Sequence, residues 1–339
     1  MSPTPVVFFA FRRPELTARV FERIRHARPR ILWISCDAAA KPADRENVER
    51  TRAVCRNVDW PCELHLDMHE HNLGAHQNIY RTLCRVYEVY EQAIMLEDDT
   101  LPDPSFFPYC EELLDRYRQA RQVYKIDGTR TAQNANGVEH SYTFTQVSNS
   151  WGWATWRDRW QSTTRLVKID FSRPRPWLAW ARNRKFRRRA RPVFSRLGAL
   201  WLLRRISPLR QRFPLSLDEE LRERARSCGK FLFAGMLAAE WRSMASYDFA
   251  LRHSIITQNR LVVTPTRNMI ENIGFGVGAA HWTDSSHPAA GRLAEPMPLP
   301  LRHPDAVGLD TRYHKKCAKA MDRMMRRPRR NGRQKNASS

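Results

Sequence analysis

The sequence has no apolar run of the roughly 18 residues that a membrane-spanning helix needs. Its first residues, Met1 to Phe11, lack the basic start, apolar stretch and small-residue cleavage site of a secretory signal peptide. With 339 residues, of which 42% are hydrophobic, the chain is long enough to bury a sizeable core. We therefore expect a globular protein of one large or two modest domains, located in the cytoplasm.

Closely spaced cysteine pairs are missing too. The seven cysteines are widely scattered and form no Cys-x-x-Cys motif: Cys36, Cys55, Cys62, Cys84, Cys110, Cys228 and Cys317. A disulfide framework or a zinc site requires a more regular pattern. The sequence therefore predicts reduced thiols, most of them buried.

Acidic residues are absent from one long stretch. From Arg173 to Leu217 there are 14 Lys or Arg and no Asp or Glu, and from Arg312 to Lys335 there are 11 basic residues against Asp322 alone. The whole chain has a net charge of +23, so the remainder is nearly neutral. The positive charge belongs to two segments, each of which needs its own explanation.

The first basic segment interleaves its arginines with Trp177, Trp180, Trp201 and several Phe and Leu. This pattern suits an anionic membrane surface, where apolar side chains insert shallowly and Arg meets lipid phosphate. A core-packed helix with a solvated basic face would give the same pattern. Nucleic acid is a third alternative, because Arg and aromatic side chains stack on bases, but no recognised nucleic-acid-binding motif accompanies the charge.

Short apolar runs alternate with helical periodicity over about the first 130 residues, which is typical of a parallel α/β sheet. The runs Pro5 to Phe11, Ile31 to Cys36 and Ala93 to Leu96 are the clearest predicted strands. Helical spacing separates them, with Pro14 at an expected helix start. We therefore predict an α/β fold with a parallel sheet flanked by helices.

Charged residues directly follow three of these runs. Arg12 and Arg13 follow the first, Asp37 the second, and the Glu-Asp-Asp triplet 97–99 the third. Parallel α/β sheets bind ligands beyond the carboxyl ends of their strands. Arginine suits phosphate, a lone carboxylate suits a base or ribose, and clustered carboxylates suit a hard cation. A nucleotide diphosphate with Mg²⁺ or Mn²⁺ would satisfy all three.

Simpler interpretations of these acids stay open. A lone strand-end acid such as Asp37 often caps the helix that follows it. Three adjacent acids are harder to explain in this way, because like charges repel unless a cation or solvent offsets them. A solvated acidic loop is nevertheless an alternative for the triplet.

Six pieces of sequence resemble a known family when taken in order: FFAFRRPE, SCDA, NLGAHQNI, IMLEDDTLPDPSFF, GWATWRDRW, and ENIGFG with a following histidine. The chain resembles bacterial GT-A glycosyltransferases and, more distantly, the N-acetylglucosaminyltransferase I family. The resemblance covers roughly residues 5–160 and 230–283 and leaves both basic segments unexplained. Its most specific part is LEDD with the Pro and Phe-Phe that closely follow.

The resemblance implies a GT-A type of α/β fold, with a Rossmann-like, mixed and mostly parallel sheet flanked by helices. Together with the charge pattern, which adds a helical basic insertion, it divides the chain into four parts. Residues 1–165 would form the nucleotide-sugar-binding core, and 166–229 a basic, Arg/Trp-rich helical insertion. Residues 230–287 would supply the acceptor side and complete the catalytic core. Residues 288–339 would be a basic C-terminal extension, partly disordered.

The resemblance also implies roles for individual residues. Asp99 would touch the metal within a DXD-type motif written EDD, and His281 would contact the metal or the diphosphate unless it is an ordinary loop histidine. The donor-binding residues would be Phe11, Arg12, Arg13, Asp37, Asn72, Gly74, Glu97 and Asp98. Among them, Asp37 would contact uracil or its equivalent, and Asp98 the ribose or the donor sugar.

An inverting transferase also needs a carboxylate that takes the proton of the acceptor hydroxyl. Asp248 resembles the aromatic-flanked acid that these relatives place before NIGFG, although a tyrosine precedes it where tryptophan is common. Asp158 is the alternative base. Trp151 and Trp153 could stack on sugar faces on the acceptor side, with burial in the core as the alternative.

The sequence thus predicts a metal-dependent, inverting glycosyltransferase that uses a UDP-sugar or a similar donor. Its acceptor would be a glycan or a lipid-linked glycan in bacterial surface-glycan synthesis, at the inner face of the membrane. The alternative function is a non-catalytic membrane- or nucleic-acid-binding protein on a degenerate nucleotide-sugar fold. A metal-dependent hydrolase or nuclease would explain the acids, but not the FRRP, NLG and NIGFG pieces in their order.

Overall fold

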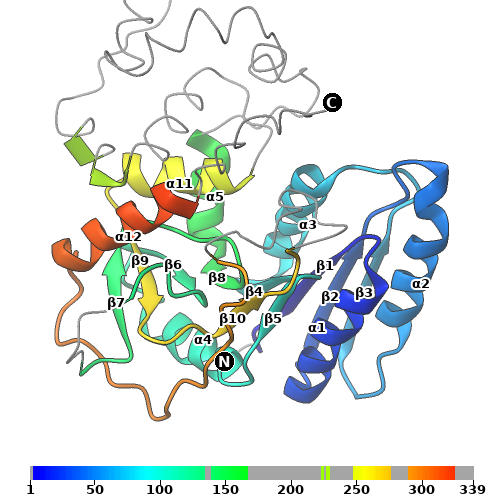
Figure 1. Ribbon diagram of the computed structural model, residues 1–339, viewed down its shortest axis with the longest axis horizontal. Helices are drawn as coiled ribbons and strands as arrows, with labels where there is room; N and C mark the ends of the chain where they lie inside the picture. Colours follow the sequence, from blue (N-terminus) through cyan, green and yellow to red (C-terminus); the bar gives the residue numbers. More distant parts are fainter. Residues whose placement is uncertain are drawn as a thin grey trace, which may run out of the picture.

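The computed structural model is built around an eight-stranded mixed sheet with the order β3-β2-β1-β4-β8-β6-β9-β7 (Figure 1). A separate two-stranded ribbon pairs β5 (Thr100–Pro102) with β10 (Ile270–Asn272) in antiparallel fashion. The residues that the structure describes are 3–133, 139–166, 223–224, 227–229, 247–275 and 289–324.

The strands of the large sheet are β1 (Val6–Ala10), β2 (Ile31–Cys36), β3 (Glu63–Met68), β4 (Gln92–Glu97), β6 (Val123–Asp127), β7 (Tyr142–Thr145), β8 (Trp153–Trp156) and β9 (Leu261–Pro265). The helices are α1 (Pro14–Ala27), the 3-10 helix η1 (Pro42–Asp44), α2 (Arg45–Arg56), α3 (Ala75–Val89), α4 (Phe106–Arg116), α5 (Arg157–Leu166), α11 (Tyr247–Thr257) and α12 (Thr311–Met324).

The N-terminal half of the sheet is parallel, and its inner strands β1, β2 and β4 are apolar, as expected where helices cover both faces, whereas the outer strand β3 is partly exposed. β1 pairs in parallel with β2 and β4, and β2 pairs in parallel with β3. Every residue of β1 and β2 is buried. β8 runs antiparallel between β4 and β6, and β7 is antiparallel to β9. The α/β fold class, with a mixed and mostly parallel sheet flanked by helices, is confirmed.

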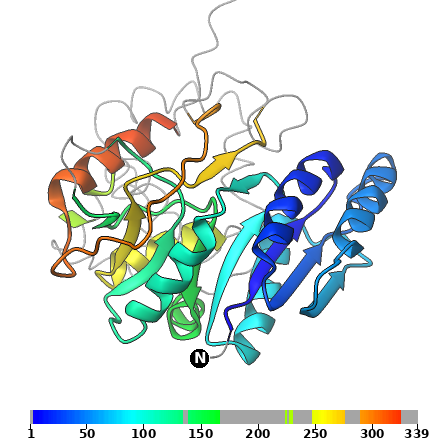
Figure 2. The ribbon, with the colours of Figure 1, turned by 90° about the horizontal axis from the view of Figure 1, so that it is seen from below.

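Helices cover both faces of the sheet (Figures 1 and 2). A hydrophobic core lies on each face. One core contains Phe21 of α1 and Tyr109 of α4. The other contains Leu83 of α3, Trp160 of α5 and Ile255 of α11. Helix α12 packs beside β7 and closes a smaller third cluster.

The register of the sheet brings the predicted ligand-binding positions to one edge. Ala10 of β1 lies opposite Cys36 of β2, and Phe9 lies opposite Glu97 of β4. The three carboxyl ends therefore meet, as they do in open parallel sheets. β8 begins at this edge because it is antiparallel to β4, with Trp153 opposite Met95.

Several predictions fall outside the described residues. His281, the basic segment from Arg173 to Leu217, and most of the predicted insertion 166–229 are among them. All seven cysteines are described; none forms a disulfide, and five of them are buried. Within the described ranges, no helix is both long enough and apolar enough to cross a membrane.

Gly152, just before β8, can be tested as a packing constraint. Its φ is +61°, and a Cβ there would lie 2.4 Å from the Ile270 side chain. We expect Gly152→Ala to lower the free energy of unfolding by about 2–4 kcal/mol, through left-handed strain and overpacking. Urea denaturation measures the change. Gly308→Ala, with no atom within 4 Å of its added Cβ, is the matched control, and an equal effect at both glycines would contradict the prediction.

Candidate functional site

Arg13 joins two members of the acidic triplet. Its guanidinium donates to the carboxylates of Asp98 and Asp99, and the distance from Nη1 to Oδ2 of Asp99 is 2.9 Å. Asp98 is 3% exposed, and its Oδ2 accepts the N–H of Phe11 at 3.2 Å. Burial raises the pKa of Asp98, and the charge of Arg13 opposes that shift. The ends of β1 and β4 are therefore tied together, with Asp99 the more exposed of the two acids.

The third acid of the triplet, Glu97, contacts a different element. Its Oε1 accepts the hydroxyl of Tyr247, the first residue of α11, at 3.0 Å. Burial, and then the nearby charge of Asp99, raise the pKa of Glu97. Tyr247 has no role in the sequence prediction, although its place next to the candidate base Asp248 was a usable signal.

Pairing of β5 with β10 brings the Asn-Ile-Gly segment 272–274 into contact with the acidic triplet. The N–H of Ile273 donates to the carbonyl of Asp99 at 2.9 Å. A Cβ on Gly274 would lie 2.3 Å from Oδ2 of Asp99, so only glycine allows this close approach. The side chain of Asn272 accepts the N–H of Gly274 at 2.9 Å. Two motifs that are far apart in sequence therefore form one structure.

Asp37 anchors the turn that precedes α3. Its Oδ1 accepts the N–H groups of Ala38 and Leu73, each at 2.9 Å. Its Oδ2 accepts the N–H of Gly74 at 2.8 Å and the Asn72 side-chain amide at 3.2 Å. Gly74 has a φ of +77°, which favours glycine. Asp37 thus orders the start of α3, and its contact with a nucleotide base stays a prediction.

Arg12 points away from the triplet toward η1. Its Nη1 lies 2.5 Å from Oδ1 of Asp44, and its side chain is 37% exposed. The guanidinium also lies over the ring of Phe11. Arg12 and Arg13 therefore occupy different positions at the end of β1, and of these two arginines Arg13 is the one that forms ion pairs with the acidic triplet.

The two candidate bases lie at opposite edges of the sheet. Asp248 is next to Tyr247 in the first turn of α11, and its Oδ2 is 3.2 Å from Nη1 of Arg252. Asp158 begins α5 beyond the carboxyl end of β8, which is the edge opposite Glu97. Its carboxylate pairs with Arg159. The geometry favours Asp248 over Asp158.

The two acceptor-side tryptophans differ in burial. Trp153 is 2% exposed; the ring of Tyr247 stacks on it at 6.4 Å, and Nζ of Lys125 lies 4.7 Å from its centre. These contacts favour the core interpretation of Trp153 over sugar stacking. Trp151 is only half-buried and makes an edge contact with Phe275. Its ring is therefore compatible with either sugar stacking or core packing.

The acids do not converge as a ready metal cage. Among the described residues, no group of three or more His, Cys, Asp and Glu side chains could hold a metal ion. Asp99 is partly exposed, with one oxygen accepting from Arg13. Mg²⁺ bound with a nucleotide commonly takes one or two carboxylates and completes its shell with phosphate oxygens and water. Of the three acids, Asp99 has the accessible carboxylate that a cation held mainly by a diphosphate would need.

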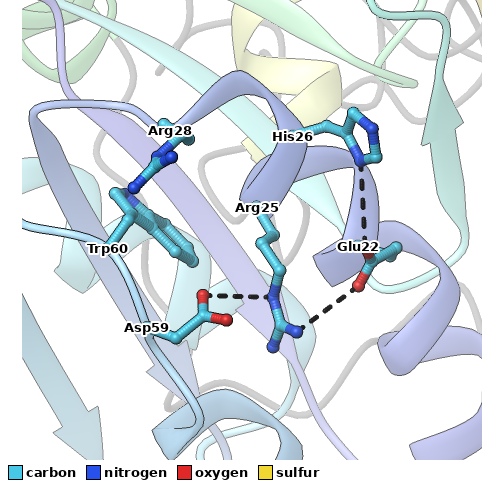
Figure 3. A pocket seen from close by; sticks show the side chains of 6 residues that line it. All are labelled: Glu22, Arg25, His26, Arg28, Asp59 and Trp60. Carbon is cyan, nitrogen blue, oxygen red and sulfur yellow. Dashed lines mark ion pairs between the residues drawn. The ribbon is translucent and has the colours of Figure 1, made fainter.

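Figure 3 shows a surface pocket at a different place. It lies at the carboxyl end of α1 and just before β3, which is the edge of the sheet away from the triplet. Ion pairs within the pocket join Arg25 to Glu22 and to Asp59. Its charged groups largely satisfy one another, and it adds nothing to the candidate site.

Comparison with solved structures finds partial likenesses. An S. aureus TarS fragment matches with 11% identity and a TM-score of 0.32, over 50% of this chain and 50% of that one. HddC from Yersinia pseudotuberculosis matches with 10% identity and a TM-score of 0.29, over 46% and 77%. An apo UDP-glucose pyrophosphorylase matches with 9% identity and a TM-score of 0.30, over 50% and 81%. The chain thus spans half of the TarS fragment. A scan against protein families gives no match, and neither does a comparison with curated proteins.

Glu97 provides a test of the electrostatics. A carboxyl group whose pKa is higher in the folded protein binds its proton more tightly there, so its ionisation destabilises the fold. The loss begins as the pH rises past the ordinary glutamate value, about 4.3, and grows toward the folded pKa. Glu97→Gln stays neutral and can still accept from Tyr247. We expect its stability advantage over the wild type to increase with pH from about 4.5 upward.

Urea denaturation at several pH values measures this difference in the free energy of unfolding. The exposed Glu49, which pairs with Arg52 on α2, provides the control variant Glu49→Gln. Parallel stability curves for the wild type and Glu97→Gln would show that the fold does not disfavour ionised Glu97.

Proposed function

We propose that this protein is a glycosyltransferase that moves a sugar from a nucleotide-diphosphate-sugar donor, a UDP-sugar in the first instance, to an acceptor hydroxyl. One observation carries the proposal. The guanidinium of Arg13, the partly exposed carboxylate of Asp99 and the glycine turn at Gly74, where a helix starts, lie together at the carboxyl ends of the parallel strands. Phosphate, cation and close backbone approach are the features of a nucleotide diphosphate that such an edge can recognise.

The start of α3 supports the donor-binding part of the proposal. The 15-residue helix begins at Ala75, with its N-terminus at the carboxyl-end edge of the sheet. A helix N-terminus carries partial positive charge and attracts phosphate. The Asp37 carboxylate accepts the N–H groups of the turn that precedes α3. The backbone that leads into this helix is therefore ordered before any ligand binds.

A divalent cation, Mn²⁺ or Mg²⁺, is part of the proposal. Asp99 would hold it together with the donor, and the ion would supply positive charge to the departing diphosphate. His281 is a further candidate contact from sequence alone. Arg13 would orient the Asp98 and Asp99 carboxylates, and would itself lie within reach of the diphosphate.

For transfer with inversion, Asp248 would take the proton of the acceptor hydroxyl as its oxygen attacks the anomeric carbon. Its carboxylate is 19% exposed, and it is adjacent to Tyr247, which contacts Glu97. The acceptor would be a glycan or a lipid-linked glycan of the bacterial surface. The basic segments would hold the enzyme peripherally at the inner, anionic face of the membrane.

A donor screen tests the proposal. UDP-, GDP-, CMP- and dTDP-sugars are added with Mn²⁺, and thermal unfolding is followed. A ligand at about 100 times its Kd should stabilise the protein by roughly 2.7 kcal/mol. Stabilisation by one nucleotide class, followed by sugar transfer to an acceptor, supports the proposal. Binding without transfer would instead favour the non-catalytic alternative, and no binding at all would exclude a nucleotide-sugar site.

Asp99→Asn should abolish the Mn²⁺-dependent part of donor binding and leave the protein folded, because an amide is a much weaker ligand for a hard cation. Calorimetric titration of the nucleotide with and without Mn²⁺ measures the effect. Asp59→Asn, at the opposite edge of the sheet, is the control and should bind as the wild type does. Full turnover of the wild type in EDTA would refute the role of the cation.

Asp248→Asn should leave donor affinity nearly intact and lower kcat by about 10²-fold or more, the usual effect of losing a general base. Steady-state kinetics with the donor varied separate the two effects. Asp158→Asn is the matched control from the opposite edge. If Asp158→Asn shows this loss and Asp248→Asn does not, Asp248 is not the base.

A further inference from the structure

Strand β6 carries a lysine and an aspartate whose side chains are completely enclosed. Lys125 and Asp127 are each 0% exposed, and Nζ lies 2.9 Å from Oδ1. Burial lowers the pKa of Lys125 and raises the pKa of Asp127, and the attraction between the two charges opposes both shifts. Well-packed apolar side chains often stabilise a fold at least as well as a buried ion pair. The pair therefore needs a reason beyond packing.

The ion pair fixes the backbone that leads into β8. Nζ of Lys125 donates to Oγ of Ser148 at 2.8 Å and to the carbonyl of Asn149. Oδ2 of Asp127 accepts the N–H of Asn149 at 2.8 Å. Both members of the pair thus hold Asn149, and Lys125 also holds Ser148.

Arg252 extends from this backbone to the candidate base. Its Nε donates to the carbonyl of Ser148 at 3.3 Å, and its Nη1 lies 3.2 Å from Oδ2 of Asp248. Arg252 is 7% exposed, so protein groups rather than water surround it. The position of Ser148 therefore bears on where the guanidinium holds the Asp248 carboxylate.

A second branch leads from the same lysine to the acidic triplet. Nζ of Lys125 lies over the ring of Trp153, and that ring is stacked on Tyr247 at an interplanar angle of 18°. The Tyr247 hydroxyl donates to Glu97. Two independent chains of contact thus start at Lys125 and end on two carboxylates of the candidate site.

We propose that the Lys125–Asp127 ion pair is a positioning device for the transfer step. One branch, through Arg252, sets the direction of the Asp248 carboxylate. The other branch, through Trp153, sets the position of the Tyr247 hydroxyl, which contacts Glu97. Lys125 and Asp127 touch no reacting atom and act through these neighbours. The inference rests on the proposed function, because it gives Asp248 the work of a base.

The test replaces both members of the pair together, because removing only one would leave a buried, uncompensated charge. Lys125→Met with Asp127→Asn keeps the shape and leaves an acceptor for the N–H of Asn149. We expect kcat to fall by roughly 10- to 100-fold, the scale of a small misplacement of reacting groups, with little change in KM for the donor. Ile126→Val is the control, since Ile126 lies in the core on the other face of the sheet.

Crystal structures of the wild type and the double variant supply a readout that needs no activity. The Asp248 carboxylate and the Tyr247 hydroxyl should be displaced in the double variant and unmoved in Ile126→Val. Unchanged positions in the double variant would overturn the inference, as would kcat and KM that worsen together in step with lower thermal stability. A wild type that transfers no sugar from any donor would refute the proposed function instead, and the crystal structures would still decide the positioning role.

Discussion

The ion pair between Arg13 and Asp98 is the interaction on which the candidate site depends. β1 and β4 are hydrogen-bonded neighbours in parallel register, so the residues just beyond them must share a small space. The guanidinium fills that space, and the N–H of Phe11 satisfies the other oxygen of Asp98. Asp98 is buried, and the chain turns at Asp98 and Asp99 before β5 begins at Thr100. β5 pairs with β10, and this pairing places Gly274 in contact with Asp99.

Much of this architecture could be predicted from the sequence, because it follows from local patterns. Uninterrupted apolar runs predict strands covered on both faces, and charged residues after the runs mark the ligand-binding edge. The helix starting at Pro14 follows from a proline at its first position and from apolar spacing. These signals each span a few neighbouring residues, so no knowledge of distant contacts is required.

The parts that local patterns could not predict depend on pairings across the fold. Nothing near Asp37 in sequence indicates that its carboxylate binds the turn at Gly74. The sequence leaves Trp153 open to sugar stacking or to burial in the core, and only the fold shows that Tyr247 of α11 stacks on its ring. The clearest overlooked signal is Lys125, a charged residue inside an otherwise strand-like run, since a lysine is almost never fully buried without a partner.

The charges at this edge bear on the proposed donor, because a nucleotide diphosphate bound here would need positive charge brought with it. Arg13 pairs with two carboxylates, which largely neutralise its positive charge. Glu97 can relieve the crowding by staying protonated, which its raised pKa favours. A diphosphate that approaches Asp99 would still meet like charge, and Coulomb repulsion is strong where water is partly excluded. A divalent cation held by Asp99 would turn that repulsion into attraction, whereas reorienting Arg13 alone would leave Asp98 buried without its partner.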